Sequence, residues 1–153
     1  MRPLYGMVAA NSQAAVEEHS RKALELMSAG AAVEECSEAL CKLRGVGVAT
    51  ASAVFAAYSA EYPFMSDEAM EAVLHAPAHG KQYSIEAYGE LCTKLRAKAA
   101  ELGDGFTARD VELALYSISH AKGCADTNLK TLKQSRQKSS ADSTPKSKRT
   151  KTK

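Results

Sequence analysis

Residues 40–54 read LCKLRGVGVATASAV, and this stretch decides the fold. Apolar residues stand at helical spacing on both sides of a central Gly-Val-Gly, which occupies positions 45–47. Two glycines that flank one apolar residue allow the chain to turn sharply, and Val46 can then fill the gap between the two helices. We therefore expect a helix-hairpin-helix element at about residues 31–60.

A hairpin of this kind exposes the backbone amides at the start of its second helix, where the helix dipole is positive. Such amides form a donor surface for a phosphate oxygen and need no charged side chain. The residues expected to bind phosphate are Arg44, Gly45, Val46, Gly47 and Thr50. The site is open only if neighbouring glutamates do not crowd it, and the candidates are Glu34, Glu35, Glu38 and Glu61. The same residues also fit a plain turn that carries no ligand.

Apolar residues recur with helical period along the rest of the chain, and no segment shows the strict alternation of a strand. The sequence therefore predicts an all-α fold, a compact orthogonal bundle of about six helices in a domain over residues 1–121. Thr107 followed by Asp110 approximates a capping box, in which each residue satisfies a backbone amide of the other. Other helix caps are expected at Asn11 or Ser12, at Ser66 and at Ser84.

Each expected helix carries an apolar stripe that should face the core. The positions expected to be buried are Val16, Ser20, Ala23 and Met27, then Val33, Cys36, Leu40 and Leu43, then Ala51, Val54, Phe55 and Tyr58, then Ile85, Tyr88, Cys92, Leu95, Ala99 and Leu102, and finally Val111, Ala114, Leu115 and Ile118. The four cysteines, Cys36, Cys41, Cys92 and Cys124, form no CxxC pair, and their spacing suits neither a zinc module nor a disulfide framework. We expect reduced thiols that are mostly buried as small hydrophobes.

Charge is divided unevenly along the chain. Nine lysines or arginines stand against two aspartates over residues 126–153, a balance of +7, so residues 1–125 carry −5 of the formal net charge of +2. Apolar residues almost vanish after residue 121, and such a segment buries too little surface to offset its ordering entropy. We therefore expect a disordered basic tail over 122–153. It would serve as a nuclear import signal, as a nucleic-acid tether or only as a solubilising segment, and its key cations are Lys146, Lys148, Arg149, Lys151 and Lys153.

Other functional patterns are absent from the sequence. It contains no GxSxG motif and no phosphate-binding GxxxxGK motif. His75 and His79 are four residues apart, but Pro77 interrupts the helix that would align them as metal ligands. No apolar run approaches the roughly 18 residues of a membrane helix. We expect no metal, no cofactor, no nucleotide and no membrane contact, and a nuclear or otherwise cytoplasmic protein that is not secreted.

The stretch from Leu43 to Asp67, which ends in Pro63-Phe-Met-Ser-Asp67, resembles the hairpin region of the helix-hairpin-helix DNA glycosylases of base excision repair. The resemblance implies that Asp67 would stabilise charge at the sugar or activate water. Bifunctional glycosylases also carry a hairpin lysine as nucleophile, and this chain has Ala49 there, so a Schiff-base route is not expected. Asp67 has a structural explanation as well, because a carboxylate in the first turn of a helix favours the dipole.

A second resemblance extends over almost the whole of the acidic body. The sequence is similar to a family of small eukaryotic helix-hairpin-helix proteins, and the similarity is carried by Arg2-Pro-Leu, Ala49-Thr-Ala-Ser-Ala53, Pro63-Phe-Met-Ser-Asp-Glu-Ala69 and Asp110-Val-Glu-Leu-Ala-Leu-Tyr116. This resemblance implies the all-helical fold and the single-domain architecture. It implies no particular activity.

Three functions remain open at this point. The leading hypothesis is a non-catalytic, sequence-independent DNA-binding or DNA-associated module that combines the hairpin with the basic tail. The first alternative is a DNA glycosylase-like enzyme that uses Asp67. The second is a protein-interaction scaffold in which the hairpin is only a turn, and in that case Gly47→Ala would harm folding without a specific effect on DNA.

Overall fold

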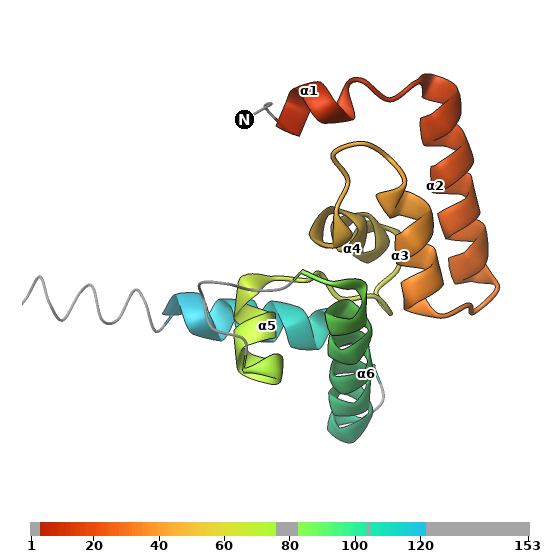
Figure 1. Ribbon diagram of the computed structural model, residues 1–153. Helices are drawn as coiled ribbons and strands as arrows, with labels where there is room; N and C mark the ends of the chain where they lie inside the picture. The colour runs from red at the N-terminus through yellow and green to blue at the C-terminus, as the bar shows by residue number, and fades with distance from the viewer. Residues whose placement is uncertain (1–3, 76–82, 104, 122–153) are drawn as a thin grey trace, which may run out of the picture. The chain divides into compact units, whose positions relative to one another are not determined.

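The computed structural model describes residues 4–75, 83–103 and 105–121 of the chain. The chain divides into two units, Met1–Ser117 and Ile118–Lys153. In the described residues all regular secondary structure is helical (Figure 1), which confirms the expected all-α class. The predicted basic tail lies outside the described residues.

Seven helices form within the described part of the chain, where about six were expected. They are α1 (Leu4–Val8), α2 (Gln13–Ser28), α3 (Val33–Cys41), α4 (Val48–Tyr58), α5 (Asp67–Leu74), α6 (Ile85–Leu102) and a last helix over 108–121. The additional helix is α1, which has only five residues and none that is buried. A helix this short carries no apolar periodicity, so no sequence pattern predicts it.

Three helices begin directly after a serine that the sequence predicted as a possible cap. Ser12, Ser66 and Ser84 accept hydrogen bonds from Ala15 N (3.2 Å), Ala69 N (3.4 Å) and Ala87 N (3.1 Å), respectively. Thr107 N donates to Asp110 Oδ2 (2.8 Å), and Asp110 N donates to Thr107 Oγ1 (3.2 Å). The predicted capping box is therefore confirmed, with aspartate in the place of the usual glutamate.

Helix α3 is the centre of the bundle, because it contacts α2, α4 and α6. The rings of Phe55 on α4 and Tyr88 on α6 stack with centroids 6.4 Å apart in the core. The buried Tyr88 hydroxyl donates to Pro63 O (3.0 Å), and the buried Ser52 hydroxyl accepts from Met65 N (3.0 Å). These two bonds satisfy backbone groups of the α4–α5 loop and so fix the loop against the core.

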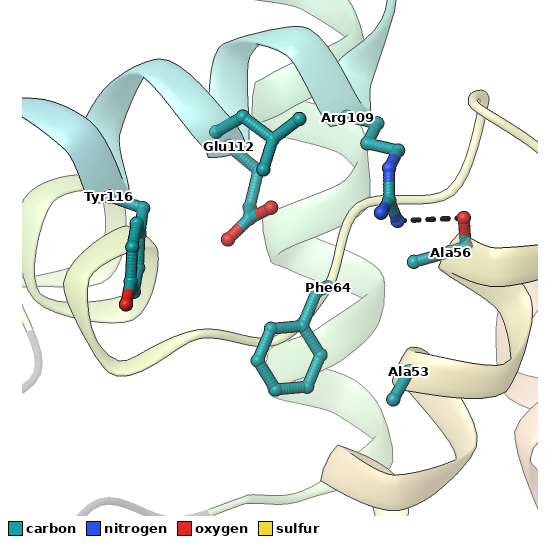
Figure 2. Close-up of a pocket in the computed structure, with 7 residues that line it drawn as sticks. Ala53, Ala56, Phe64, Arg109, Glu112 and Tyr116 are labelled. Atoms are coloured by element: carbon teal, nitrogen blue, oxygen red, sulfur yellow. Dashed lines mark hydrogen bonds between the residues drawn. The ribbon is translucent and has the colours of Figure 1, made fainter.

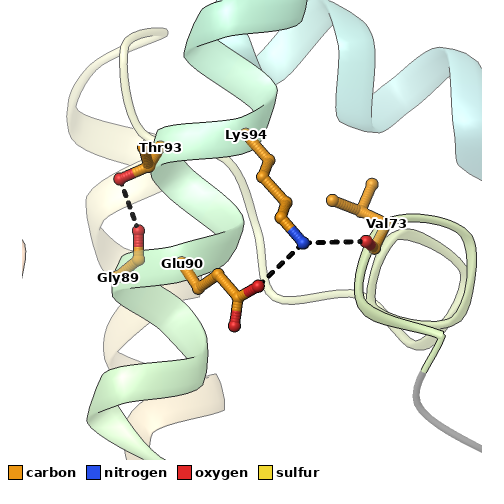
Figure 3. Close-up of polar contacts among 5 residues, drawn as sticks. All are labelled: Val73, Gly89, Glu90, Thr93 and Lys94. Atoms are coloured by element: carbon orange, nitrogen blue, oxygen red, sulfur yellow. Dashed lines mark hydrogen bonds and ion pairs between the residues drawn. The ribbon is translucent and has the colours of Figure 1, made fainter.

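A lysine of α6 also hydrogen-bonds to the C-terminal end of α5 (Figure 3). Lys94 on α6 donates to the Val73 carbonyl oxygen (3.4 Å) and pairs with Glu90 Oε1 (2.7 Å). A lysine near the end of a helix favours its exposed carbonyls, so Lys94 helps to close α5. His75, the C-cap of α5, lies in the left-handed region with a φ of 53°.

Several residues expected in the core are exposed, and those predictions were wrong. Val16, Val54 and Tyr58 lie on the surface, as do Leu102, Ala114 and Ile118. The error is clearest in α4, which is apolar on nearly all sides, so periodicity does not identify the inner face. The positions of α4 that are in fact buried are Val48, Ala51, Ser52, Phe55 and Ala56.

Candidate functional site

The turn between α3 and α4 contains the residues that the sequence singled out for phosphate binding. α3 ends at Cys41 and α4 begins at Val48. Leu43 is buried and Val46 packs against the core. Backbone bonds from Leu43 N to Leu40 O (3.0 Å) and from Val46 N to Leu43 O (3.1 Å) close the turn. The two apolar residues therefore anchor the turn to the core, as their pattern predicted.

The N-terminal segment packs directly on this turn. Asn11 Nδ2 donates to Arg44 O (2.9 Å), and Asn11 Oδ1 accepts from Arg44 N (2.8 Å). A Cβ on Gly45 would stand 2.9 Å from Val8 Cγ2 and 3.0 Å from Met7 Cβ. Gly45 also has a φ of +78°, which L side chains rarely adopt. Both the contact and the conformation therefore require glycine at this position, and only the conformation was predictable from the sequence.

Gly47, the second glycine of the turn, is exposed and faces open space. It is the N-cap of α4 with a φ of −104°, and no side chain of the described residues caps this helix. A Cβ on Gly47 would meet no atom within 4 Å. The first amides of a helix lack partners inside the helix, so an anion can approach those of α4 past Gly47. Thr50 is exposed in the first turn of the same helix.

Two cations lie beside the turn, and both are exposed. Lys42 shares a surface depression with Glu35 and Glu38, so its charge is partly compensated. The Glu34 carboxylate lies on α6 instead of the turn, against the backbone of Gly89. Arg44 is the second exposed cation of the turn, and its backbone is held by Asn11.

Asp67 is placed at the start of α5, directly after the Ser66 cap. It is exposed, and its Oδ1 accepts a hydrogen bond from the Tyr83 hydroxyl. That hydrogen bond is the main reason why the pKa of Tyr83 is raised. A carboxylate in the first turn favours the helix dipole, so the position of Asp67 is explained without catalysis. Its catalytic role stays a prediction.

The cysteines and histidines of the described residues do not form a reactive cluster. Burial raises the pKa of Cys36, and it raises the pKa of Cys92 to about 11, so both thiols stay protonated at neutral pH. Cys36 and Cys92 are buried as expected, and Cys41 is half-buried. In the described part of the chain no three His, Cys, Asp or Glu side chains come together as a metal site. No helix found there has the length and hydropathy needed to cross a bilayer.

Some predicted positions fall outside the described residues. These are His79, Cys124 and the five tail cations Lys146, Lys148, Arg149, Lys151 and Lys153.

A second candidate site was not anticipated from the sequence. A pocket of about 270 Å³ lies between α4, the α4–α5 loop and the last helix (Figure 2). Glu112 lines it and is only 3% exposed. A signal for its burial was present, because Glu112 precedes Leu115, which was expected in the core, by three residues and so shares its helix face. It was missed because an isolated glutamate in a helix is normally solvent-exposed.

Comparisons of the chain with protein-family models, with curated proteins and with solved structures find no match. The two resemblances drawn from the sequence therefore stay predictions.

Proposed function

We propose that this protein binds the phosphate backbone of DNA, without catalysis and without sequence preference, through a helix-hairpin-helix element formed by α3, the turn at 42–47 and α4. The observation that carries the proposal is the open N-terminus of α4 at Gly47, beside the exposed Arg44. Backbone amides read phosphate and not base edges, so the contact is independent of sequence.

The uneven distribution of charge along the chain supports different roles for the hairpin and the tail. Residues 1–125 carry −5, so the body as a whole repels a polyanion at long range. Residues 126–153 carry +7 and supply the attraction, through cations that include Lys146, Lys148, Arg149, Lys151 and Lys153. In this proposal the tail concentrates the protein on DNA and directs it to the nucleus, and the hairpin orients it.

The decisive variant is Gly47→Asp in the full-length protein. The N-cap backbone of Gly47 is extended, and an aspartate there accepts hydrogen bonds from the amides of α4. The variant therefore caps the helix, keeps the fold and fills the anion site with a carboxylate. We expect its affinity for a fluorescent duplex, measured by anisotropy at low salt, to fall about tenfold or more, equivalent to about 1.4 kcal/mol.

The matched control is Ala32→Asp. Ala32 is the N-cap of α3, and it too has no side-chain cap, so the control introduces the same charge at an equivalent position of another helix. Its affinity should stay within about twofold to threefold of the wild type, because one distant exposed charge is largely screened. Equal losses in the two variants, or no binding by the wild-type protein at low salt, would refute the proposal.

Base excision is not part of the proposal. Asp67 is exposed, bonded to Tyr83 and placed where it supports the start of α5. A glycosylase would release a free base from damaged duplexes and would lose that activity in Asp67→Asn. Incubation of both proteins with a panel of damaged duplexes separates this alternative from simple binding.

A further inference from the structure

The pocket beside Glu112 has the composition of a ligand site, and it is separate from the hairpin turn. Its wall on α4 consists of the small side chains Ala53 and Ala56, and Phe64 of the α4–α5 loop forms another wall. The last helix supplies the remaining lining. A volume of about 270 Å³ lies just below the usual range for small-molecule sites, so the pocket suits a small ligand. Such sites are mostly apolar with a few placed polar groups.

Three large apolar side chains around this pocket remain open to solvent. Phe64 is 36% exposed, Leu113 is 45% exposed and Tyr116 is 44% exposed. All three line the same pocket, so their exposed surface is contiguous and not scattered. Apolar surface gathered around one opening favours an aliphatic or aromatic group that covers it.

The polar floor of the pocket is a buried carboxylate. Glu112 is directed into the same space as Phe64, with Tyr116 on one side and Arg109 on the other (Figure 2). Burial raises the pKa of Glu112, and the hydrogen bond with Ser66 opposes that rise. A buried charge is costly unless it is paired, and no cation of the described residues forms an ion pair with Glu112.

Arg109 is the nearest candidate partner, and its guanidinium is engaged elsewhere. Arg109 Nη1 donates to the Ala56 carbonyl oxygen (2.7 Å), at the C-terminal end of α4. The charged groups that influence Glu112 are Arg109 on its own helix and Glu68 on α5. A ligand with a single positive charge would supply the ion pair that Glu112 lacks among the described residues.

We propose that this pocket binds a primary alkylammonium group, with the ammonium on the Glu112 carboxylate and the alkyl chain against Phe64, Leu113 and Tyr116. An ammonium needs only one carboxylate oxygen, which suits Glu112 because the Ser66 side chain also acts on this carboxylate and lowers its pKa. A planar guanidinium prefers both oxygens and fits less well.

The group has two natural sources, a free alkylamine and the side chain of a lysine in a partner protein. The direct test is a titration of the full-length protein with n-butylammonium, followed by the methyl NMR signals of Ala53, Ala56 and Leu113. We expect saturable shifts at these three methyls. n-Butanol, which has the same alkyl chain without the charge, should bind about tenfold more weakly or not at all.

The key variant is Glu112→Gln, which keeps the shape of the side chain and removes its charge. Its affinity for n-butylammonium should fall about tenfold, and Glu18→Gln, which removes an exposed carboxylate from α2, should have no effect. The wild-type affinity should also fall as the pH is lowered through the raised pKa of Glu112, because protonation removes the carboxylate that receives the ammonium. A peptide containing lysine then identifies the source of the ammonium, with its Nε-acetylated form as the uncharged control. Tighter binding by the peptide than by n-butylammonium points to a protein partner, and equal binding points to a free amine.

The inference is overturned if n-butanol binds as tightly as n-butylammonium, or if the methyl signals do not shift. It is also overturned if a folded Glu112→Gln protein keeps the wild-type affinity. Should that variant fail to fold, the comparison of the two compounds on the wild-type protein still decides. None of these outcomes depends on whether the protein binds DNA.

Discussion

The two glycines of the α3–α4 turn have different structural roles. Gly45 has a positive φ and lies against Val8 and Met7, whereas Gly47 has an ordinary φ and open space around it. The sequence contains both in one motif, and it does not predict that only Gly45 has a close contact with the N-terminal segment. The structure assigns the conformational requirement to Gly45 and leaves Gly47 free to be varied.

We expect Gly45→Ala to lower the free energy of unfolding by about 2 kcal/mol or more, because a left-handed backbone penalty adds to a close contact. Gly47→Ala should change it by less than about 1 kcal/mol, since alanine fits this backbone and restricts the unfolded chain. Urea denaturation of the full-length variants measures both values. Similar losses in the two variants would contradict the different structural roles of Gly45 and Gly47.

At the scale of single elements, the stability of the N-terminus of the last helix depends on pH. The hydrogen bond from the Thr107 hydroxyl, followed by that from its backbone amide, lowers the pKa of Asp110. The folded pKa therefore lies below the unfolded value of about 3.9, so the stabilisation is present above that pH and is lost as the pH falls through the lowered value.

The corresponding prediction concerns Asp110→Asn. Its free energy of unfolding should be lower than that of the wild type near pH 7, and the difference should shrink as the pH falls below about 4. Urea denaturation over a pH series checks this. Glu18→Gln, which removes an exposed carboxylate from α2, provides the control. A difference between wild type and Asp110→Asn that stays constant with pH would contradict the assignment.

Helices were predicted correctly where capping residues or a long apolar stripe mark them in the sequence. Serine caps, the box of Thr107 and Asp110 and the long apolar stripe of α6 all gave correct elements, because their signals lie within one turn of the residue concerned. The packing of α1 on Gly45 and the pocket around Glu112 were not predictable. Both depend on residues far apart in the sequence, and no local pattern specifies which partner a helix face will meet.

At the scale of the whole molecule, the proposed function gives the attraction to DNA to the basic tail and the orientation of the protein on DNA to the hairpin. If the tail supplies the attraction, replacement of Lys146, Lys148, Arg149, Lys151 and Lys153 by glutamine should weaken DNA binding and reduce the salt dependence of the affinity. Each phosphate contact contributes about 0.9 to the slope of log K against log salt, so the slope should fall by up to about 4 or 5. Gly47→Asp should change it by no more than about 1. Anisotropy over a salt series measures both slopes, and an unchanged slope in the tail variant would contradict this assignment.

The two hydrogen bonds between Asn11 and the Arg44 backbone affect whether the α3–α4 hairpin could be transferred to another protein on its own. Asn11 and Arg44 are 33 residues apart, and the asparagine satisfies both backbone groups of Arg44. A graft of residues 33–58 onto another scaffold would therefore leave one donor and one acceptor of the turn to be satisfied by water or by the host. During synthesis, Asn11 leaves the ribosome before Arg44, so the two hydrogen bonds between them form only after the residues of the turn have been made. Evolution could thus alter or exchange this hairpin only together with the segment that precedes α2.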